Sequence, residues 1–220
     1  AELLSTFSGG RGLLMGGIPG VKPTRVVIIG AGTVAEYAAR SAVGLGALVS
    51  VFDNSVARLR RMQSDLNFPI ATSIMQPKVL EKALKRADVA IGALRAKEGR
   101  TPCVISDEMV QKMKPKSVIV DVSIDQGGCF ETSELTTHES PTFIKHDVIH
   151  YGVPNIASRV AKTASFSLSN ILAPLLLEVG EGGGVKGMLL RSPNIRGGVY
   201  VYNGIITVSY THLRAHETPL

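Results

Sequence analysis

Cysteine, tryptophan and aromatic residues are scarce in this chain. Among its 220 residues there are two cysteines, no tryptophan and only 5% aromatic residues. Cys103 and Cys129 form no CxxC pair, which argues against a disulfide-stapled scaffold and against a zinc knuckle. We therefore expect two free cysteines, a reducing compartment and no metal site.

Long runs of one residue class are absent as well. The 24 Lys and Arg residues exceed the 18 Asp and Glu residues, but they are scattered apart from short clusters such as 58–61. Because nucleic-acid-binding domains gather their basic residues, no nucleic-acid partner is expected. The apolar run at 171–177 is far shorter than the roughly 20 residues that span a bilayer, and no signal peptide is visible. We expect a cytoplasmic protein without membrane association. Because the chain does not begin with Met, we also expect it to be a piece of a longer protein.

Short apolar runs alternate regularly with helical patterns. Strands are expected at 25–30, 47–52, 70–75, 89–94, 118–124 and 148–153. Helices are expected at 33–45, from a cap at Asn54 or Ser55 to about 66, at 77–87 and from a cap at Ser106 to 113. Such apolar strands indicate a parallel sheet covered on both faces, and right-handed crossovers make it doubly wound. The predicted fold class is α/β, a Rossmann dinucleotide-binding domain.

The regions outside this alternation differ in character. Residues 1–24 are Gly-rich and are predicted to be a connecting segment before the domain at 25–162. From about residue 163 a helical pattern begins, and we interpret its apolar stripe as core or interface. The stripe consists of Leu168, Ile171, Leu172, Leu175, Leu176 and Val179.

The first strand leads into a glycine-rich turn. Residues 30–35 read GAGTVA, which matches G-x-G-x-x-A after an apolar strand and at the start of a helix. Gly30 permits the tight turn, Gly32 lets the backbone approach a pyrophosphate, and Ala35 lets the helix pack on the strand. The helix N-terminus offers free N–H groups to phosphates. The alternative is a glycine-rich turn that binds nothing.

An acidic residue follows the second strand at the position that a dinucleotide site needs. Asp53 lies 21 residues beyond Gly32, where a carboxylate can accept both hydroxyls of the adenosine ribose. It would repel a 2′-phosphate and therefore favours NAD over NADP, although Arg58 lies near enough to weaken that preference. The cofactor predicted from these residues is NAD.

A second polar group lies at the end of the fifth predicted strand. Ligands of doubly wound sheets bind beyond the carboxyl ends of the strands. Leu94 ends the fourth strand, and Asp125-Gln126-Gly127-Gly128 follows the fifth. Asp125 is therefore expected to face the nicotinamide half of a dinucleotide. A role in capping or turning the chain explains its position equally well.

Several segments together resemble a known family, the alanine dehydrogenase branch of the alanine dehydrogenase and transhydrogenase family. The similarity runs from about Leu3 to Thr207, and the stretch IDQGGCFETS separates it from a generic dinucleotide fold. The segments that carry it are GGIPGV (16–21), VVIIGAGTVAEYAA (26–39), KRADVAIGAL (85–94), VIVDVSIDQGGCFETS (118–133), LTTHESPTF (135–143), HYGVPNIA (150–157) and KTASFSLSN (162–170).

The resemblance implies NAD-dependent oxidative deamination of L-alanine to pyruvate and ammonia, and the reverse reaction. It implies that Asp125 is the active-site carboxylate, which holds the reacting amino group or water. It further implies that the cofactor-binding residues are Gly30, Gly32, Thr33 and Val34 at the pyrophosphate, Asp53 at the ribose, Arg58 on the adenosine side, Leu94 and Val122 beside the cofactor, and Asn155 and Ile156 at the nicotinamide.

The family's substrate-carboxylate Arg, its Lys and its acid/base His lie in an N-terminal domain that this chain does not include. None of the five histidines here is therefore expected to be catalytic. The resemblance implies a homo-oligomer, specifically a hexamer, and a helical return to the missing substrate domain at 163–207. Residues 208–220 have no counterpart in the family and are predicted to be a non-native tail. Two alternatives remain, the NAD-binding domain of a transhydrogenase-type subunit and a non-catalytic NAD-binding module.

Overall fold

The computed structural model describes residues 1–95 and 100–206. The chain divides into two units, Ala1–Pro154 and Asn155–Leu220. The predicted tail at 208–220 lies outside the described residues, so it stays a prediction, as do the predicted domain boundaries.

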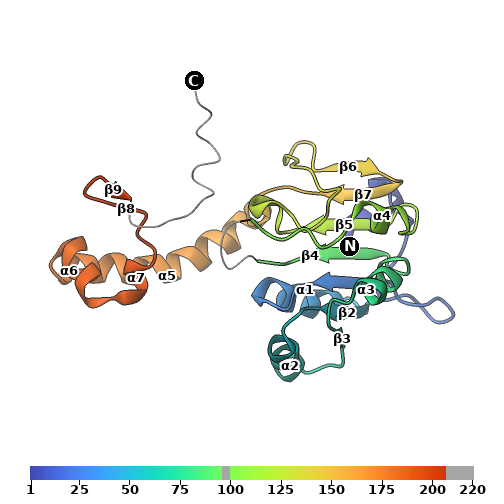
Figure 1. The fold of residues 1–220 in the computed structure, drawn as a ribbon, viewed down its shortest axis with the longest axis horizontal. Helices are drawn as coiled ribbons and strands as arrows, with labels where there is room; N and C mark the ends of the chain where they lie inside the picture. Colours follow the sequence, from blue (N-terminus) through green and yellow to red (C-terminus); the bar gives the residue numbers. More distant parts are fainter. Residues whose placement is uncertain (96–99, 207–220) are drawn as a thin grey trace. The chain divides into compact units, whose positions relative to one another are not determined.

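A seven-stranded sheet forms the centre of the first unit (Figure 1). Its order is β3-β2-β1-β4-β5-β7-β6, and every neighbouring pair is parallel except β6 and β7. The strands are β1 (Arg25–Ile29), β2 (Leu48–Phe52), β3 (Ala71–Ser73), β4 (Val89–Gly92), β5 (Val118–Asp121), β6 (Thr142–Lys145) and β7 (Val148–Tyr151). This order is the doubly wound arrangement, so the predicted fold class is confirmed.

The edge strand β6 is the one strand of this seven-stranded sheet that the sequence did not predict. It pairs with β7 across a two-residue turn formed by His146 and Asp147, whose φ angles are +53° and +56°. Positive φ at both central residues is the requirement of the tightest hairpin turn, for which Asn-Gly is the usual signal. His-Asp is a rare choice for that turn, and the strand was therefore missed.

Helices cover both faces of the sheet, as the sequence predicts. They are α1 (Thr33–Gly44), α2 (Val56–Asp65), α3 (Pro77–Leu84) and α4 (Asp107–Gln111). Ser55 and Ser106 cap α2 and α4 by accepting the backbone N–H groups of Arg58 and Met109. These local capping signals are the reason that the helix starts were predictable.

Two apolar clusters lie on opposite faces of the sheet. Alternate strand residues point to opposite faces, so Val26 and Ile28 of β1 pack in one cluster while Val27 and Ile29 pack in the other. The first cluster includes residues of α1 and α2, and the second includes residues of α3 and α4. The parallel strands are therefore buried on both faces, as continuous apolar runs require.

The N-terminal segment packs onto this domain. It contains two short 3-10 helices, η1 (Glu2–Leu4) and η2 (Thr6–Ser8), and Leu4 is only 1% exposed. The Arg11 guanidinium donates to the Asp88 carboxylate at 3.0 Å, and Lys114 reaches the same carboxylate at 2.7 Å. Residues 1–24 are therefore tied to the sheet by a buried apolar side chain and an ion pair.

The second unit is mainly helical. Its elements are η4 (Ile156–Val160), α5 (Ala161–Glu181), α6 (Gly184–Arg191), α7 (Pro193–Arg196), β8 (Val201–Tyr202) and β9 (Ile205–Ile206). Pro174 lies inside α5, and no α5 residue is buried. The predicted stripe is exposed at Leu168, Ile171 and Leu176, which are 59% to 70% exposed. Leu175 and Val179 of the same stripe are partly buried.

One helical stretch among the described residues is long and apolar enough to cross a membrane, by length and composition alone. It runs over Ile156–Glu181, and an 18-residue window within it has a mean hydropathy of 1.3. The count of uninterrupted apolar residues missed it because Ser, Thr and Asn break the run without adding charge. The prediction of no membrane association is therefore not confirmed.

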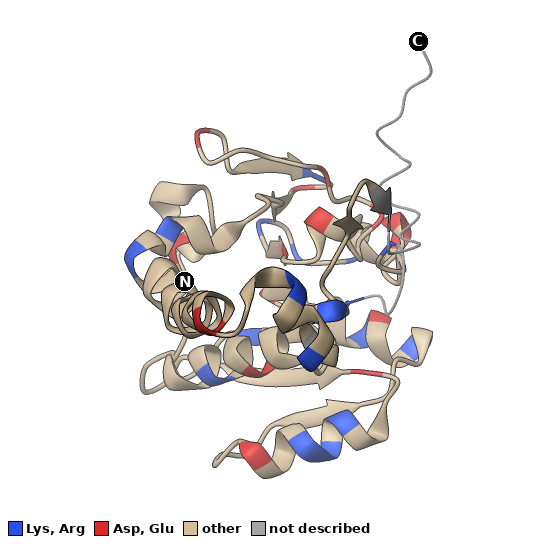
Figure 2. Cartoon of the chain, turned by 90° about the vertical axis from the view of Figure 1, so that its left-hand side faces the viewer, with Lys and Arg blue, Asp and Glu red and all other residues tan. Residues whose placement is uncertain are grey.

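Lys and Arg are dispersed over several elements in Figure 2, with no continuous basic stretch along one helix or strand. The structure thus gives the same picture of charge as the sequence, and the absence of a nucleic-acid partner stays a prediction.

Candidate functional site

The turn between β1 and α1 has the geometry that its glycines predict. Gly30 has φ +110°, and its N–H donates to the Phe52 carbonyl at 2.7 Å. A Cβ at Gly30 would collide with the Ala93 carbonyl. Only glycine therefore fits where the turn passes between the ends of β2 and β4. Gly30 is required by the fold before any ligand is considered.

Gly32 differs from Gly30, because a Cβ built at Gly32 meets no atom within 4 Å. It is the N-cap residue of α1, with φ −87°, an angle that any residue adopts. Neither backbone strain nor packing against the protein therefore explains the glycine. Open space at a helix N-terminus is what the approach of a phosphate needs, and Gly32 and Thr33 lie where the sequence places them. Ala35 is fully buried, as the close packing of α1 on the sheet predicts.

Asp53 follows β2 and fastens the glycine-rich turn. It is 3% exposed, and its two oxygens accept the N–H groups of Ala31 at 2.8 Å and Ser55 at 2.7 Å. The Arg58 guanidinium lies 3.6 Å from the same carboxylate. A carboxylate has about four acceptor positions, so Asp53 can accept further hydroxyls. Its ribose role and the adenosine-side role of Arg58 stay predictions.

A pocket of about 200 Å³ opens where β4 and β5 end, and we call it the edge pocket. Its walls are Val34 from α1, Ala93, Leu94 and Arg95 after β4, and Val122, Ser123, Asp125 and Gln126 after β5. The Ser123 hydroxyl donates to the Leu94 carbonyl at 2.8 Å and so joins the two segments. Four of the predicted site residues therefore meet in one cavity, namely Val34, Leu94, Val122 and Asp125.

Val34, which the family resemblance places at the cofactor, has a side chain that is 51% exposed. The buried face of α1 consists of Ala35, Ala39 and Ala42, four and three residues apart. Val34 lies one residue before that face, which turns it toward the edge pocket.

The end of the fifth strand was predicted wrongly. The strand was expected to reach Ile124, but β5 ends at Asp121, and Ile124–Gln126 forms the 3-10 helix η3. The apolar residues Val122 and Ile124 misled the prediction, because Val122 faces the edge pocket and Ile124 is buried beneath the loop. Asp125 is an exposed residue of η3. Asp125 therefore lies on a 3-10 turn that lines the edge pocket, four residues after the end of β5.

Asp121 is the residue of this region that the sequence analysis missed. It is 2% exposed, and its carboxylate accepts the N–H groups of Ser123 at 3.1 Å and Cys129 at 2.9 Å, and the Ser133 hydroxyl at 2.8 Å. The Phe130 N–H lies at 3.4 Å. Asp121 thus holds the loop 122–133 in shape. An acid inside the run VIVDVSI was the available signal.

The paired glycines after Asp125 also have a structural explanation. Gly127 and Gly128 have φ angles of +103° and +72°. A Cβ at Gly128 would lie 2.8 Å from the Asp121 carboxylate, and one at Gly127 would lie 2.8 Å from the Arg100 guanidinium. They let the loop turn tightly over these protein groups.

Burial sets the ionisation of two groups near the site. Burial, and then the Asp121 charge, raises the pKa of the Cys129 thiol well above its ordinary range. Burial likewise lowers the pKa of His150, whose Nδ1 lies 2.9 Å from the Val148 carbonyl and whose Nε2 lies 2.8 Å from the Thr132 hydroxyl. Both groups are neutral at pH 7. His150 has structural partners on both nitrogens.

The neutral state of His150 predicts how stability depends on pH. Its folded pKa lies below the ordinary value of 6.5, so the unfolded chain takes up the proton first as the pH falls. The free energy of unfolding should therefore decrease below about pH 6.5, by up to about 1.4 kcal/mol per pH unit. Urea unfolding at pH 7.5 and pH 5.0 measures this. The variant His150→Gln, which does not titrate, should show a shallower decrease, and a decrease equal to that of the unchanged chain would refute the assignment.

Two predicted residues belong to the second unit. Asn155 precedes η4 with φ +52°, and Ile156 is the first residue of η4. Their role at the nicotinamide stays a prediction. In the part of the chain that the structure describes, no group of three His, Cys, Asp or Glu side chains is arranged to hold a metal ion.

Comparison with known proteins gives a family match over nearly the whole chain. The family model described as "Alanine dehydrogenase/PNT, C-terminal domain" matches residues 1–209. A curated alanine dehydrogenase of Mycolicibacterium smegmatis is 46% identical over 175 residues, covering 80% of this chain and 47% of that protein. One of Methanococcus maripaludis is 39% identical over 220 residues, covering 100% of this chain and 58% of that protein. This second alignment includes residues 208–220.

A solved structure of an L-alanine dehydrogenase matches with a TM-score of 0.89 at 37% identity. The match covers 98% of this chain and 58% of that one. The chain thus spans about half the length of the relatives that it matches.

Proposed function

The chain belongs to the alanine dehydrogenase/PNT C-terminal domain family, and from that premise we propose that it is the NAD-binding half of an enzyme that oxidises L-alanine to pyruvate and ammonia. The observation that carries the proposal is the meeting of Val34, Leu94, Val122 and Asp125 in one pocket beside the glycine-rich turn. NAD, when bound, supplies the hydride acceptor for the oxidation and the hydride donor for the reverse reaction.

The residues present fit a dinucleotide. Gly32 leaves open space at the N-terminus of α1, where the N–H groups of the first helical turn bind phosphate oxygens. The Asp53 carboxylate, already ordered by Ala31 and Ser55, accepts ribose hydroxyls and disfavours a 2′-phosphate. Val34, Leu94 and Val122 give the nicotinamide end apolar walls that exclude water. The roles of Asn155 and Ile156 at the nicotinamide rest on the family resemblance alone.

Asp125 is the proposed catalytic residue. Its carboxylate opens into the edge pocket, and it holds the amino group of the substrate, or the water that replaces that group, by accepting its hydrogen bonds. Asp121 is a second carboxylate nearby, but it is buried, and its oxygens already accept hydrogen bonds from donors of its own loop. Of these two carboxylates, Asp125 alone is open to a substrate.

The remaining parts of the proposal concern the whole protein. The groups that bind the substrate carboxylate and transfer protons lie in the half that this chain does not include. We propose a homo-oligomer, specifically a hexamer, in the cytoplasm, with L-alanine, pyruvate and ammonia as its small-molecule partners. Sedimentation of the full-length protein tests the assembly.

NADH formation tests the activity. The full coding sequence, including the part upstream of Ala1, should yield a protein that forms NADH from L-alanine, measured by absorbance. Glycine, L-serine and L-valine are the comparison substrates. A protein that binds NAD but prefers another amino acid would refute the substrate, and one that binds NAD without turning over any amino acid would favour the non-catalytic module.

A transhydrogenase-type subunit is the second candidate, and the apolar stretch Ile156–Glu181 is the observation that favours it. Such a subunit needs further membrane-spanning helices. The sequence downstream of this chain decides the matter, since several long apolar segments there would replace the first proposal.

The contrast between Gly30 and Gly32 gives a sharp test of NAD binding. A methyl group at Gly32 enters open space, so Gly32→Ala should change the free energy of unfolding by no more than about 0.5 kcal/mol. It should weaken NAD binding about tenfold or more, because the backbone can no longer approach the phosphates. Calorimetry measures the affinity. Gly44→Ala is the matched control, since that glycine also faces open space, at the far end of α1. Equal NAD affinity in both variants would remove the turn from the site.

A further inference from the structure

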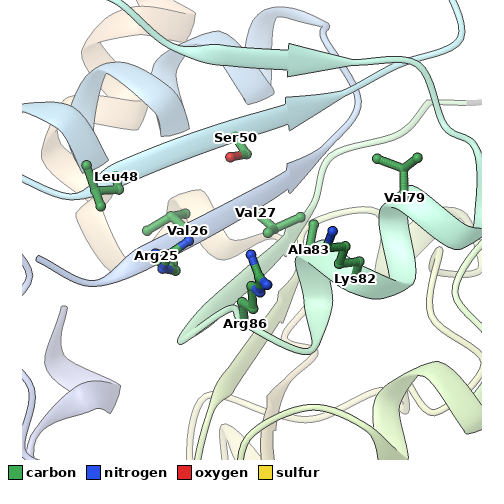
Figure 3. Close-up of a pocket in the computed structure, with 9 residues that line it drawn as sticks. All are labelled: Arg25, Val26, Val27, Leu48, Ser50, Val79, Lys82, Ala83 and Arg86. Atoms are coloured by element: carbon green, nitrogen blue, oxygen red, sulfur yellow. The ribbon is translucent and has the colours of Figure 1, made fainter.

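A second pocket lies at the opposite end of the strands from the edge pocket, and we call it the basic pocket. It has a volume of about 260 Å³. Figure 3 shows its two sides, residues of β1 and β2 on one and residues of α3 and its C-terminal end on the other. Arg25 and Leu48 are the first residues of their strands, whereas Gly30 and Asp53 follow the strand ends. Five residues of strand separate the two ends by about 13 Å.

The chain topology explains why this pocket exists. β3 lies at the sheet edge, and the chain must return through α3 to reach β4 on the far side of β1. The return covers Val27 and Ile29 of β1, which are buried. It leaves the same face of β2 partly open, so that Leu48 remains 49% exposed. The pocket is therefore a feature of the sheet face and not a gap between the two units.

Three cationic side chains line the basic pocket, namely Arg25, Lys82 and Arg86. No ion pair within residues 1–95 and 100–206 joins any of them to a carboxylate. The acids nearest in sequence are already engaged, since Glu81 pairs with Lys112, and Asp88 pairs with Arg11 and Lys114. Three like charges facing one small space repel one another unless an anion joins them.

The helix end accounts for only part of this cluster. Cations near a helix C-terminus are favourable because of the helix dipole, and this explains Lys82 and Arg86 at the end of α3. It does not explain Arg25, which starts β1 on the opposite side of the pocket. Two guanidinium groups and an ammonium group converging from two elements form the donor set that binds a phosphate or carboxylates.

The floor of the basic pocket is apolar. Val27, Leu48, Val79 and Ala83 contribute to it, and the exposed fractions of Leu48 and Val79 are 49% and 41%. A ligand that covers these side chains gains the free energy of removing apolar surface from water. The volume equals that of about nine liquid water molecules, far too small to enclose a dinucleotide. The occupant is therefore small, with a charged end and an apolar part.

From these features we propose that the basic pocket binds a small organic anion that carries at least two negative charges and an apolar group. Its anionic end lies between Arg25, Lys82 and Arg86, and its apolar part covers Leu48 and Val79. This site is separate from the proposed NAD site, and the proposal stands whether or not L-alanine is the substrate.

Phenyl phosphate is a suitable probe, because it joins a dianion to a flat apolar ring. Titrated into the 220-residue chain with labelled Val and Leu methyl groups, it should shift the NMR signals of Val27, Leu48 and Val79 in a saturable way. Phenol should produce no saturable shift, and inorganic phosphate should bind more weakly than phenyl phosphate. The signals of Val34, Leu94 and Val122 report the edge pocket and should stay in place.

Two double variants supply the control. Lys82→Gln with Arg86→Gln should weaken phenyl phosphate binding about tenfold or more, because two charged hydrogen-bond donors to the anion are lost. Lys78→Gln with Lys85→Gln removes the same charge from α3 and its end outside the pocket and should leave the affinity unchanged. Equal weakening in both, absence of saturation, or shifts confined to the edge pocket would each overturn the proposal.

Discussion

Replacing Asp125 by Asn in the full-length protein should lower kcat by about 10² to 10⁴, the range expected when a positioned acid or base is lost. NAD affinity should stay within about twofold, because Asp125 lines only the nicotinamide end of the proposed site. Asn keeps the shape of Asp and one acceptor oxygen but cannot carry the negative charge that holds an ammonium group. The loss should therefore fall on the chemical step and not on cofactor binding.

Steady-state rates and NAD calorimetry on the same preparations measure the two quantities. Glu131→Gln is a suitable control, since Glu131 is an exposed acid of the same loop outside the edge pocket. It should retain nearly full activity. A kcat for Asp125→Asn within a few-fold of that of the unchanged enzyme would contradict the catalytic role. The alternative, that Asp125 caps or turns the chain, would then remain.

The second large effect concerns folding. Asp121→Ala should reduce the free energy of unfolding by about 3–5 kcal/mol, because it leaves the buried N–H groups of Ser123 and Cys129, and the partly buried Ser133 hydroxyl, without an acceptor. That is a large fraction of the roughly 5–15 kcal/mol that stabilises an ordinary domain. Urea unfolding followed by circular dichroism measures it.

Asp65→Ala provides the comparison for Asp121. Asp65 is a surface acid whose oxygen lies 3.9 Å from the Arg61 guanidinium, and such pairs contribute about 1 kcal/mol or less. If the two variants lost equal stability, the hydrogen bonds of Asp121 would not organise the loop. Asp121→Asn should be intermediate, since one amide oxygen still accepts.

Local signals in the sequence predict the main elements of the fold, but they do not predict the structural role of Asp121. The helix starts at Ser55 and Ser106, the glycine-rich turn and the alternation of strands with helices follow from local signals, and they were predicted. The role of Asp121 depends on hydrogen bonds to Cys129 and Ser133, 8 and 12 residues away. No local pattern encodes such contacts, and the apolar residues around Asp121 suggested a longer strand.

The candidate site was predictable to a similar degree. A motif and a family resemblance named Val34, Leu94, Val122 and Asp125, but only the fold brings them into one pocket. The basic pocket was not foreseen, because Arg25, Leu48 and Lys82 belong to separate elements and share no motif. Its existence follows from the path of α3 across the sheet. A single sequence shows that path only in outline.

The central claim is that NAD binds along the glycine-rich turn and enters the edge pocket. Titration of NAD into the chain with labelled Val and Leu methyl groups tests it most directly. The claim predicts saturable shifts of Val34, Leu94 and Val122, with NAD binding more tightly than NADP and with Val27, Leu48 and Val79 unchanged. Shifts confined to Val27, Leu48 and Val79, or no saturable shift at all, would contradict it.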